Sequence, residues 1–505
     1  MKRVVLVLAA FALPLAALAP HSQASNAKKG DPIFLRDHLA GFDAIGVHLG
    51  PEQVDTTIEP SVAVNPSNPL NAVIGFQVGR VDAGGDATNG YSVTFDGGKH
   101  WHNGVIPGLT RAHGGPYDRA SDAVVAFGPD NHVYYSSLVF DDTTGSGLHS
   151  AIVNNTSIDG GRSWGPVNVV QADPGAGLND KNWVVVDQGG QGNHHLGRIY
   201  VVWDRVAGVI AKYSDDQGNT WVPASPVYIP NVYAAQGISA YPVVKPNGDL
   251  VVAFMAAVAP PAVTAKPGDE LGEALAGISK VSIATFVGAG AVPTGVPLPP
   301  AVVTSVATFT GNSVRHQRAG GLLAADVDPK SGRVYVVWED GRYRKDAAND
   351  AVLAWSDDLI RWSAPVRLNR GPKNNWVDHY NPSIAVHKDG TVDVIWRQRT
   401  ETASADESTY SLKIDTYLAR SHTRGESFGL PLKVDRSPSD TRYGAYSRNS
   451  LFQGDYEQVA TAGGLTYIVR CESYAPSKKA IAPDVLSATT RHHQTTWVSV
   501  VGTAH

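Results

Sequence analysis

Short runs of alternating apolar and polar residues recur along the chain in pairs, and a turn rich in Gly, Asn, Asp or Pro joins the members of each pair. A period of two places successive side chains on opposite faces of a strand, so each pair predicts a β-hairpin. Seven hairpins are expected, at 60–77, 122–140, 182–203, 241–254, 322–338, 382–396 and 456–470. No segment shows the convincing periodicity of an amphipathic helix. The pattern therefore predicts an all-β protein.

A second element recurs after the hairpins, with the form Ser/Thr-x-Asp-x-Gly-x-x-Trp. Complete copies occupy 94–101, 157–164 and 214–221, and altered copies begin at Ser356 and Ser421. We expect the Asp to accept hydrogen bonds from backbone N–H groups, the Gly to adopt positive φ and the Trp to pack between repeated units. In the three complete copies, the residues with these structural roles are Asp96, Gly98, Trp101, Asp159, Gly161, Trp164, Asp216, Gly218 and Trp221.

A repeated unit of about 60 residues with four short strands is typical of a β-propeller blade. We expect seven four-stranded antiparallel blades, with six as the alternative, and the turn motif between the third and fourth strands. The fourth unit has no turn motif and contains a Pro/Gly/Ala-rich segment at about 257–303, which predicts a surface insertion. Residues 25–54 are then an N-terminal extension, and 55–505 form a single propeller domain.

The first 24 residues have the pattern of an export signal. Lys2 and Arg3 precede an apolar stretch at 4–18, and Ser22-Gln23-Ala24 fits a cleavage site. A membrane anchor is the alternative, but the apolar stretch is short for a membrane span. The sequence thus predicts a secreted or periplasmic protein, cleaved after Ala24, with no membrane association afterwards.

Charge and cysteine content narrow the possible partners. The formal net charge is −5, which argues against nucleic acid and anionic membranes. Cys471 is the single cysteine, so no intrachain disulfide can form, and packing must hold the fold. We expect Cys471 to lie in the core and the protein to be a monomer.

The turn motif and the unit length resemble those of the Asp-box, or BNR-repeat, β-propellers, the superfamily that includes the sialidases (neuraminidases). The resemblance covers roughly residues 59–500. It implies Asp-box turns in every complete copy and a sialidase-like exo-glycosidase that acts on an acidic sugar. Sialidases carry three arginines that bind the substrate carboxylate, a Tyr nucleophile paired with a Glu, and an Asp acid/base.

The chain departs from the sialidase pattern at its N-terminal end. The Phe/Tyr-Arg-Ile-Pro motif of sialidases is absent, and the nearest stretch, Ile58-Glu59-Pro60-Ser61, has Glu59 in place of the arginine. Tyr446-Ser447-Arg448 resembles the stretch that carries the sialidase tyrosine.

The topology of a blade predicts where a site would lie. The loop into the first strand and the loop out of the second strand share one face, opposite the turn motifs, so residues beside the hairpins should converge at one mouth of the central channel. Charged and aromatic residues at these positions include Arg80, Arg119, Asp122, Asp180, Lys181, Asp204, Arg318, Glu339, Arg342, His379, Tyr380, Tyr446, Arg448, Asp455 and Tyr456.

From this set we take two groups of candidates. The candidate catalytic residues are Tyr446, Asp122, His379 and Tyr380, because such groups transfer protons or act as nucleophiles. The candidate substrate-binding residues are Arg119, Arg318, Arg342 and Arg448, because arginine binds carboxylates in fork geometry. The expected partner is an acidic glycan or glycoconjugate. The structural alternative is that these charges are solvated or that Arg–Asp pairs brace neighbouring blades.

The sequence predicts no metal site and no cofactor, since HExxH, CxxC, EF-hand, phosphate-loop and GxSxG patterns are all absent. Three functions stay open at this stage. They are an exported glycan-active enzyme (an exo-glycosidase, or a lyase acting on uronate glycans), a non-catalytic propeller that binds glycans or proteins, and an assembly factor.

Overall fold

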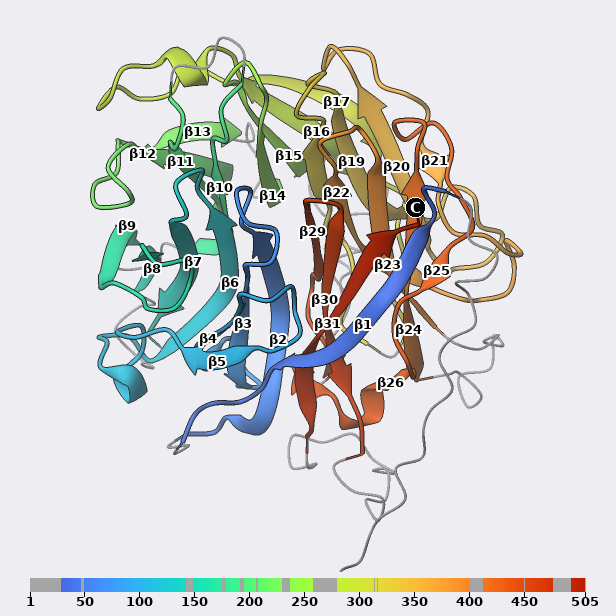
Figure 1. Ribbon diagram of the computed structural model, residues 1–505, viewed down its shortest axis with the longest axis horizontal. Helices are drawn as coiled ribbons and strands as arrows, with labels where there is room; N and C mark the ends of the chain where they lie inside the picture. The colour runs from blue at the N-terminus through green and yellow to red at the C-terminus, as the bar shows by residue number, and fades with distance from the viewer. Residues whose placement is uncertain are drawn as a thin grey trace, which may run out of the picture.

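The computed structural model describes residues 29–46, 50–141, 149–173, 179–190, 195–205, 208–228, 237–257, 279–312, 314–315, 317–399, 412–448, 450–475 and 492–504. The predicted signal peptide lies outside these residues. Within them the chain is all-β, as the sequence predicts, and its helical segments are short 3-10 turns such as Arg111–His113 (Figure 1).

The strands form successive antiparallel groups of four in which each strand pairs with the next along the chain. The first three groups are β2 (Gln53–Val64), β3 (Ala72–Arg80), β4 (Asp86–Thr94) and β5 (His102–Val105); β6 (Arg119–Phe127), β7 (Val133–Phe140), β8 (Ser150–Ser157) and β9 (Val167–Asp173); and β10 (Asn179–Val186), β11 (Ile199–Arg205), β12 (Gly208–Ser214) and β13 (Ser225–Tyr228).

The next three groups follow the same plan. They are β14 (Gly237–Val244), β15 (Leu250–Ala257), β16 (Ser279–Phe286) and β17 (Val302–Thr308); β18 (Ala324–Val327), β19 (Val334–Asp340), β20 (Asp350–Ser356) and β21 (Val366–Arg367); and β22 (His379–Val386), β23 (Val392–Arg399), β24 (Lys413–Ser421) and β25 (Leu432–Lys433), with β26 (Ser439–Asp440) also on β24. A small hairpin, β27 (Ala445–Ser447) and β28 (Ser450–Phe452), then precedes β29 (Gln458–Ala462), β30 (Leu465–Ser473) and β31 (Gln494–Thr503).

The first strands of the groups surround a common centre. They contact one another in the order β2, β6, β10, β14, β18, β22 and β29, and β29 contacts β2 again. In Figure 1 the fourth strands, such as β9 and β17, lie at the edge of the molecule. The predicted hairpins are the first two strands of these groups. This is the plan of a β-propeller, in which first strands line the channel.

The two ends of the described chain meet in the last group. Strand β1 (Pro32–Gly41) pairs antiparallel with β31 and supplies the fourth strand after β29, β30 and β31 (Figure 1). A buried ion pair also joins β1 to β30, since Arg470 Nη2 lies 2.8 Å from Asp37 Oδ1. The segment predicted as an N-terminal extension therefore contains a strand of the sheet.

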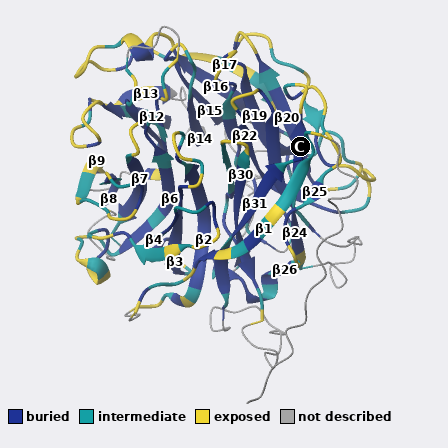
Figure 2. Ribbon diagram, in the orientation of Figure 1, coloured by how far each residue is buried: buried dark blue, intermediate teal, exposed yellow. Residues whose placement is uncertain are grey.

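The core follows the alternating pattern of the strands. Figure 2 shows buried residues along the strands and exposed residues in the loops. Trp203, Trp338 and Trp396 occupy corresponding places in β11, β19 and β23 and are fully buried. Cys471 is a buried free thiol. No helix in the described part of the chain is long and apolar enough to cross a membrane.

The turn motifs connect third and fourth strands. In the second copy Ser157 Oγ donates to Asp159 Oδ1 at 2.8 Å, and Asp159 Oδ1 accepts from Ser163 N at 2.9 Å. Gly161 has φ 95° and Trp164 packs edge-on against Tyr135 at 5.4 Å. The copies at Thr94 and Ser214 have matching bonds. The motif thus satisfies backbone groups at a tight turn, as its sequence predicts.

The segment at about 257–303, which the sequence predicts to be a surface insertion, also contains a strand of the sheet. Strand β16 lies within it and pairs with both β15 and β17, so this part belongs to the sheet. Residues 258–278 lie outside the described residues.

We expect Asp37→Ala to lower the free energy of unfolding by about 3–5 kcal/mol, because the buried Arg470 guanidinium would lose its partner on β1. Chemical denaturation followed by tryptophan fluorescence measures this change. Leu39→Ala, on an exposed side of the same strand, is the control and should change stability by about 0.5 kcal/mol or less. Equal effects of the two substitutions would show that the ion pair does not hold β1.

Candidate functional site

The first strands share an irregularity near the centre of the molecule. Five of them contain a register shift, or bulge, beside a non-Gly residue with positive φ. These residues are Glu59 (51°), Asp122 (47°), Lys181 (45°), Ser239 (65°) and Asn381 (48°). Each such conformation costs about 1–3 kcal/mol and persists only where the surroundings hold it. The channel therefore has polar residues fixed in strained conformations at corresponding positions.

Acidic side chains hold the bulges in place. Asp204, at the end of β11, accepts hydrogen bonds from Ser239 N at 2.6 Å and Ala240 N at 3.2 Å. Glu339, at the end of β19, accepts from Gly321 N at 2.5 Å and Asn381 N at 3.3 Å. Each acceptor bonds to the bulge of a following unit. Asp204 and Glu339 are thus positioning residues of the channel.

Carboxyl groups gather around Lys181. Burial, and then the charges of Asp180 and Glu59, raise the pKa of Asp122 well above its usual range. Burial and the charge of Asp455 raise the pKa of Glu59 to about 7. The cluster can therefore hold protons at neutral pH, which a proton donor requires.

Two arginines lie side by side next to this cluster. Arg318 Nη2 lies 2.6 Å from Asp455 Oδ2, and its Nη1 donates to Ser447 Oγ at 3.1 Å. Arg80 Nη2 donates to the same hydroxyl at 2.7 Å. Both guanidinium groups lie over the Phe452 ring, at 4.2 Å for Arg318 and 4.7 Å for Arg80. The hairpin β27–β28 thus places a hydroxyl and an aromatic face between two positive charges.

Arg119 and Arg448 lie on the same side of the molecule. Arg119 Nη1 donates to Gly84 O at 2.6 Å, and its charge acts on Asp86 together with those of Arg80 and Arg318. Arg448 is exposed, and its charge acts on Asp180. Arg318 and Arg448 therefore lie near the carboxyl cluster, and Arg119 lies near Asp86.

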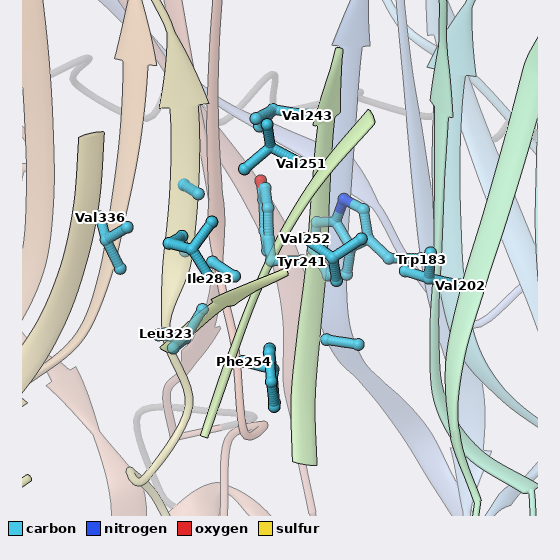
Figure 3. Packing of buried hydrophobic residues seen from close by; sticks show 14 of the residues in the cluster. Trp183, Val202, Tyr241, Val243, Val251, Val252, Phe254, Ile283, Leu323 and Val336 are labelled. Atoms are coloured by element: carbon cyan, nitrogen blue, oxygen red, sulfur yellow. The ribbon is translucent and has the colours of Figure 1, made fainter. Parts of the chain in front are cut away.

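A small pocket lies between the first strands, with room for about one water molecule. Its lining includes Lys181, Trp183, Tyr241, Asn381, Asp455 and Tyr456. The rings of Trp183 and Tyr241 lie 4.3 Å apart between centroids, and Figure 3 shows them beside each other.

Several polar atoms of the pocket wall are unsatisfied. Asn381 Oδ1, Tyr456 Oη and Glu457 Oε2 are buried and have no hydrogen-bond partner within the part of the chain that the structure describes. Buried polar groups are nearly always hydrogen-bonded.

Other predicted site residues are held elsewhere. Arg342 forms a bidentate pair with Asp340, at 2.8 Å for both contacts, and donates to Thr308 O at 2.7 Å. His379 is buried with Nδ1 2.9 Å from Asn349 O, and burial lowers its pKa to about 4. The Arg342–Asp340 pair lies within one unit, whereas the bonds from Arg342 to Thr308 and between His379 and Asn349 join neighbouring units.

The two predicted tyrosines also have other surroundings. Tyr380 is buried in a small apolar cluster, and its hydroxyl donates to Gln317 Oε1 at 3.4 Å. Tyr446 is half-buried, and its backbone N donates to Gln53 Oε1 at 2.7 Å. Burial and then the charge of Asp82 raise the pKa of Tyr446. Asp122 is the predicted catalytic residue that lies within the carboxyl cluster.

Sequence reasoning did not select Glu59, Lys181, Asp455 or Tyr456 as site residues. The available signal was their place at or next to the start of a buried first strand, which they share with Asp122. Glu59 and Lys181 are set apart by a bulge in their strands, which the sequence does not reveal.

No metal-binding cluster of three or more His, Cys, Asp or Glu side chains is found among the described residues. No family model and no curated protein matches the sequence.

Solved structures with a similar backbone include three distant proteins. The phage phi92 endosialidase is 11% identical, with a TM-score of 0.49, over 94% of this chain and 70% of that chain. A protein of unknown function from Dyadobacter fermentans is 12% identical, with a TM-score of 0.45, over 94% and 99% of the two chains. The Penicillium chrysogenum alpha-L-arabinanase complexed with arabinobiose is 11% identical, with a TM-score of 0.44, over 93% and 99%.

The carboxyl groups of the channel predict a pH-dependent stability, and Glu339 provides the test. Burial raises its pKa from 4.5 to about 8. Between pH 4.5 and about 8, Glu339 keeps its proton in the folded chain but releases it in the unfolded chain. Stability therefore falls as pH rises through this window, by about 1.4 kcal/mol per pH unit for one group.

We expect Glu339→Gln to remove this contribution, so that the free energy of unfolding depends less steeply on pH between pH 5 and 8. Urea denaturation at a series of pH values measures the slope. Glu426→Gln, an exposed residue, is the control and should leave the slope unchanged. An unchanged slope in Glu339→Gln would show that this carboxyl is ionised in the folded protein.

Proposed function

We propose that this protein is an exported, seven-bladed β-propeller enzyme that cleaves glycans containing an acidic sugar. The observation that carries the proposal is a cluster of carboxyl groups with raised pKa values beside arginines at the centre of the molecule. Asp122 and Glu59 supply the carboxyl groups, and Arg318 and Arg448 supply the arginines. The cyclic contacts of the first strands support seven blades, and the sequence of residues 1–24 supports export.

Glycoside hydrolysis commonly needs one carboxylic acid and one carboxylate on opposite sides of the scissile bond. Asp122 fits the acid, because its raised pKa keeps a proton available at neutral pH. Asp455 fits the carboxylate, because it is paired with Arg318 at 2.6 Å and lines the pocket. The acid would protonate the leaving oxygen, and the carboxylate would activate water or attack the sugar.

The arginines would select the substrate. A sugar carboxylate accepts hydrogen bonds from guanidinium groups in fork geometry. Arg318 is half-buried and Arg448 is exposed, so both can reach a bound ligand. The aromatic walls formed by Trp183 and Tyr241 would contact the apolar face of a sugar ring.

A binding propeller without catalysis is the second candidate. It is favoured by one observation, since Glu59 and Asp122 are only 5% exposed each. Such burial limits contact with a large substrate. The experiment below separates the two functions.

The first experiment incubates the protein with sialylated and uronate-containing glycans and analyses the products by mass spectrometry. A product that gains water supports hydrolysis. A product with a new double bond shows that the enzyme is a lyase. Binding of a panel member without any product overturns the enzymatic proposal in favour of the binding propeller.

Arg318→Met should lower kcat/KM on the acidic substrate by about 10²-fold, which corresponds to loss of a charged hydrogen bond. Arg342→Met is the matched control, because Arg342 is paired with Asp340 away from the pocket. Initial rates at low substrate concentration measure both variants. A loss as large in Arg342→Met would contradict this site.

Asp122→Asn should lower kcat by about 10²–10⁴-fold, the usual contribution of a general acid. In the wild type the rate should fall as pH rises through the raised pKa of Asp122, and this alkaline fall should be absent in the variant. Asp326→Asn is the control, since burial raises the pKa of Asp326 to about 7 but Val386 N already donates to its carboxylate at 2.7 Å. The proposed role is wrong if both variants keep the wild-type pH–rate profile.

A further inference from the structure

Trp376 has an unusual backbone conformation for a tryptophan. It lies in the loop between β21 and β22 and has φ 58°, which is a clear outlier for a bulky residue. Such conformations persist only where the surroundings hold them, and they gather at functional sites. The loop leads into the first strand of its group, so Trp376 lies on the face where the channel opens.

A buried ion pair holds this conformation. The backbone N of Trp376 donates to Asp346 Oδ2 at 2.8 Å. Arg344 grips the same carboxylate with two bonds, from Nη2 to Oδ2 at 2.7 Å and from Nε to Oδ1 at 2.8 Å, and donates to Asn375 Oδ1 at 3.0 Å. The side chains of Arg344 and Asp346 are 0% and 2% exposed. The pair therefore fixes the backbone from which the indole extends.

The indole of Trp376 is accessible to solvent. The residue is half-buried, and its Nε1 makes no hydrogen bond with any described residue, yet this atom is not among the buried unsatisfied ones. In the turn motifs, by contrast, the Nε1 atoms of Trp101, Trp164 and Trp221 are buried. Trp376 therefore offers a donor and part of its ring to a ligand, whereas the turn-motif tryptophans pack inside the molecule.

Positive charge surrounds the indole. The half-buried Arg315 has its Cζ 4.0 Å from the centroid of the Trp376 ring. Two exposed lysines lie beside each other at the same place, since Lys345 N donates to Lys373 O at 2.8 Å. This surface is basic although the chain has a net charge of −5. We call it the Trp376 surface, and it consists of Trp376, Arg315, Lys345 and Lys373.

We propose that the Trp376 surface is an accessory subsite that binds a second acidic sugar of the same glycan chain. The indole would contact the apolar face of a sugar ring, and the Arg315 guanidinium would bind its carboxylate. Arg315 and Arg318 lie in the same segment between β17 and β18, so their Cα atoms are at most about 11 Å apart. A glycan of a few sugar units is long enough to contact both arginines.

The ligand class is therefore an oligosaccharide with repeated acidic sugars. This inference rests on the proposed function in taking an acidic glycan as the ligand, and it adds the length and the charge of that glycan.

A second Arg–Trp pair provides a matched control. Arg333 Cζ lies 3.7 Å from the centroid of the half-buried Trp355 ring. The Arg333 side chain is only 6% exposed and is paired with Asp357 at 2.7 Å. Trp355 lies in β20, beside the altered turn motif at Ser356 and thus on the face opposite the channel mouth. The stacking is the same, but this pair braces the sheet.

The experiment titrates the protein with oligosaccharides of galacturonate and of sialic acid, and with the two monosaccharides, in a calorimeter at low salt. The wild type should bind at least one oligosaccharide more tightly than its monosaccharide. Trp376→Ala should weaken that binding by about tenfold, because an aromatic contact is lost, and Trp376→Phe should keep most of the affinity. Trp355→Ala should leave it unchanged. Wild-type affinity in Trp376→Ala overturns the proposal.

Charge is tested with the methyl ester of the bound oligosaccharide, which should bind more weakly than the acid. Equal affinities would show that Arg315 does not contact a carboxylate and would contradict the subsite.

Arg318→Met separates this subsite from the proposed function. Weaker binding in Arg318→Met together with unchanged binding in Trp376→Ala would support the proposed site and reject the subsite. The reverse result would support the subsite and reject the proposed site. No binding of any oligosaccharide by the wild type would reject both.

Discussion

The centre of this molecule depends on acidic side chains that accept backbone N–H groups across unit boundaries. Asp204 bonds to the bulge at Ser239, and Glu339 bonds to the bulge at Asn381. A bulge leaves backbone donors without partners, and an unpaired buried donor costs about 1–3 kcal/mol. These carboxyl groups satisfy the donors and at the same time keep non-Gly residues at positive φ. The shape of the channel and the position of its polar groups follow from the same bonds.

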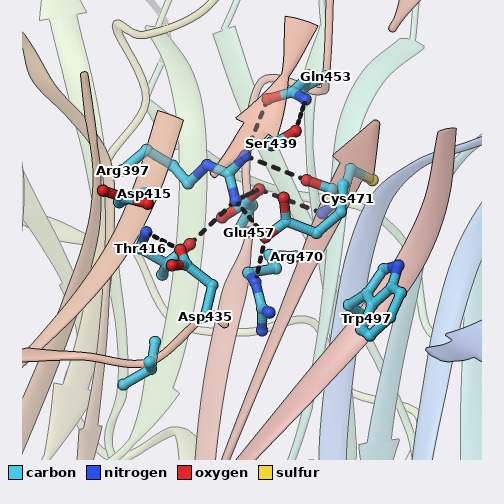
Figure 4. A network of polar contacts seen from close by, with 12 residues as sticks. Arg397, Asp415, Thr416, Asp435, Ser439, Gln453, Glu457, Arg470, Cys471 and Trp497 are labelled. Atoms are coloured by element: carbon cyan, nitrogen blue, oxygen red, sulfur yellow. Dashed lines mark hydrogen bonds and ion pairs between the residues drawn. The ribbon is translucent and has the colours of Figure 1, made fainter. Parts of the chain in front are cut away.

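Buried charge is used in two different ways. Figure 4 shows Arg397 among Gln453, Glu457 and the Cys471 carbonyl. In this network most charged side chains contact a group of opposite charge. The contacts of Arg397 join β23 to β30. Around Lys181, several carboxyl groups face a single lysine. Burial raises their pKa values, as it raises those of Glu457 and Asp435 in the first network. The first arrangement stabilises the packing of units, and the second leaves groups available for proton transfer or binding.

The sequence predicted the repeated unit because its signals are local. A hairpin needs only an alternating run and a turn, and the Asp159 turn motif needs only eight neighbouring residues. The site was harder to predict. Arg119, Arg318 and Arg448 were selected from the blade topology and lie near one another, whereas Arg342, chosen by the same rule, is paired with Asp340 in its own unit. Whether an arginine beside a strand points to the channel or to its neighbour depends on contacts that local sequence does not contain.

The sequence by itself determined the all-β class, the hairpins and the turns, because each rests on the conformational preferences of a few adjacent residues. Only the tertiary structure decided which polar residues share an environment. Glu59 and Asp455 are far apart in the sequence, yet the backbone N of Asp455 donates to Glu59 Oε1 at 3.0 Å. The raised pKa of Glu59, and the place of the Lys181 amine between Trp183 and Tyr456, exist because the ring of first strands excludes water and brings these groups together.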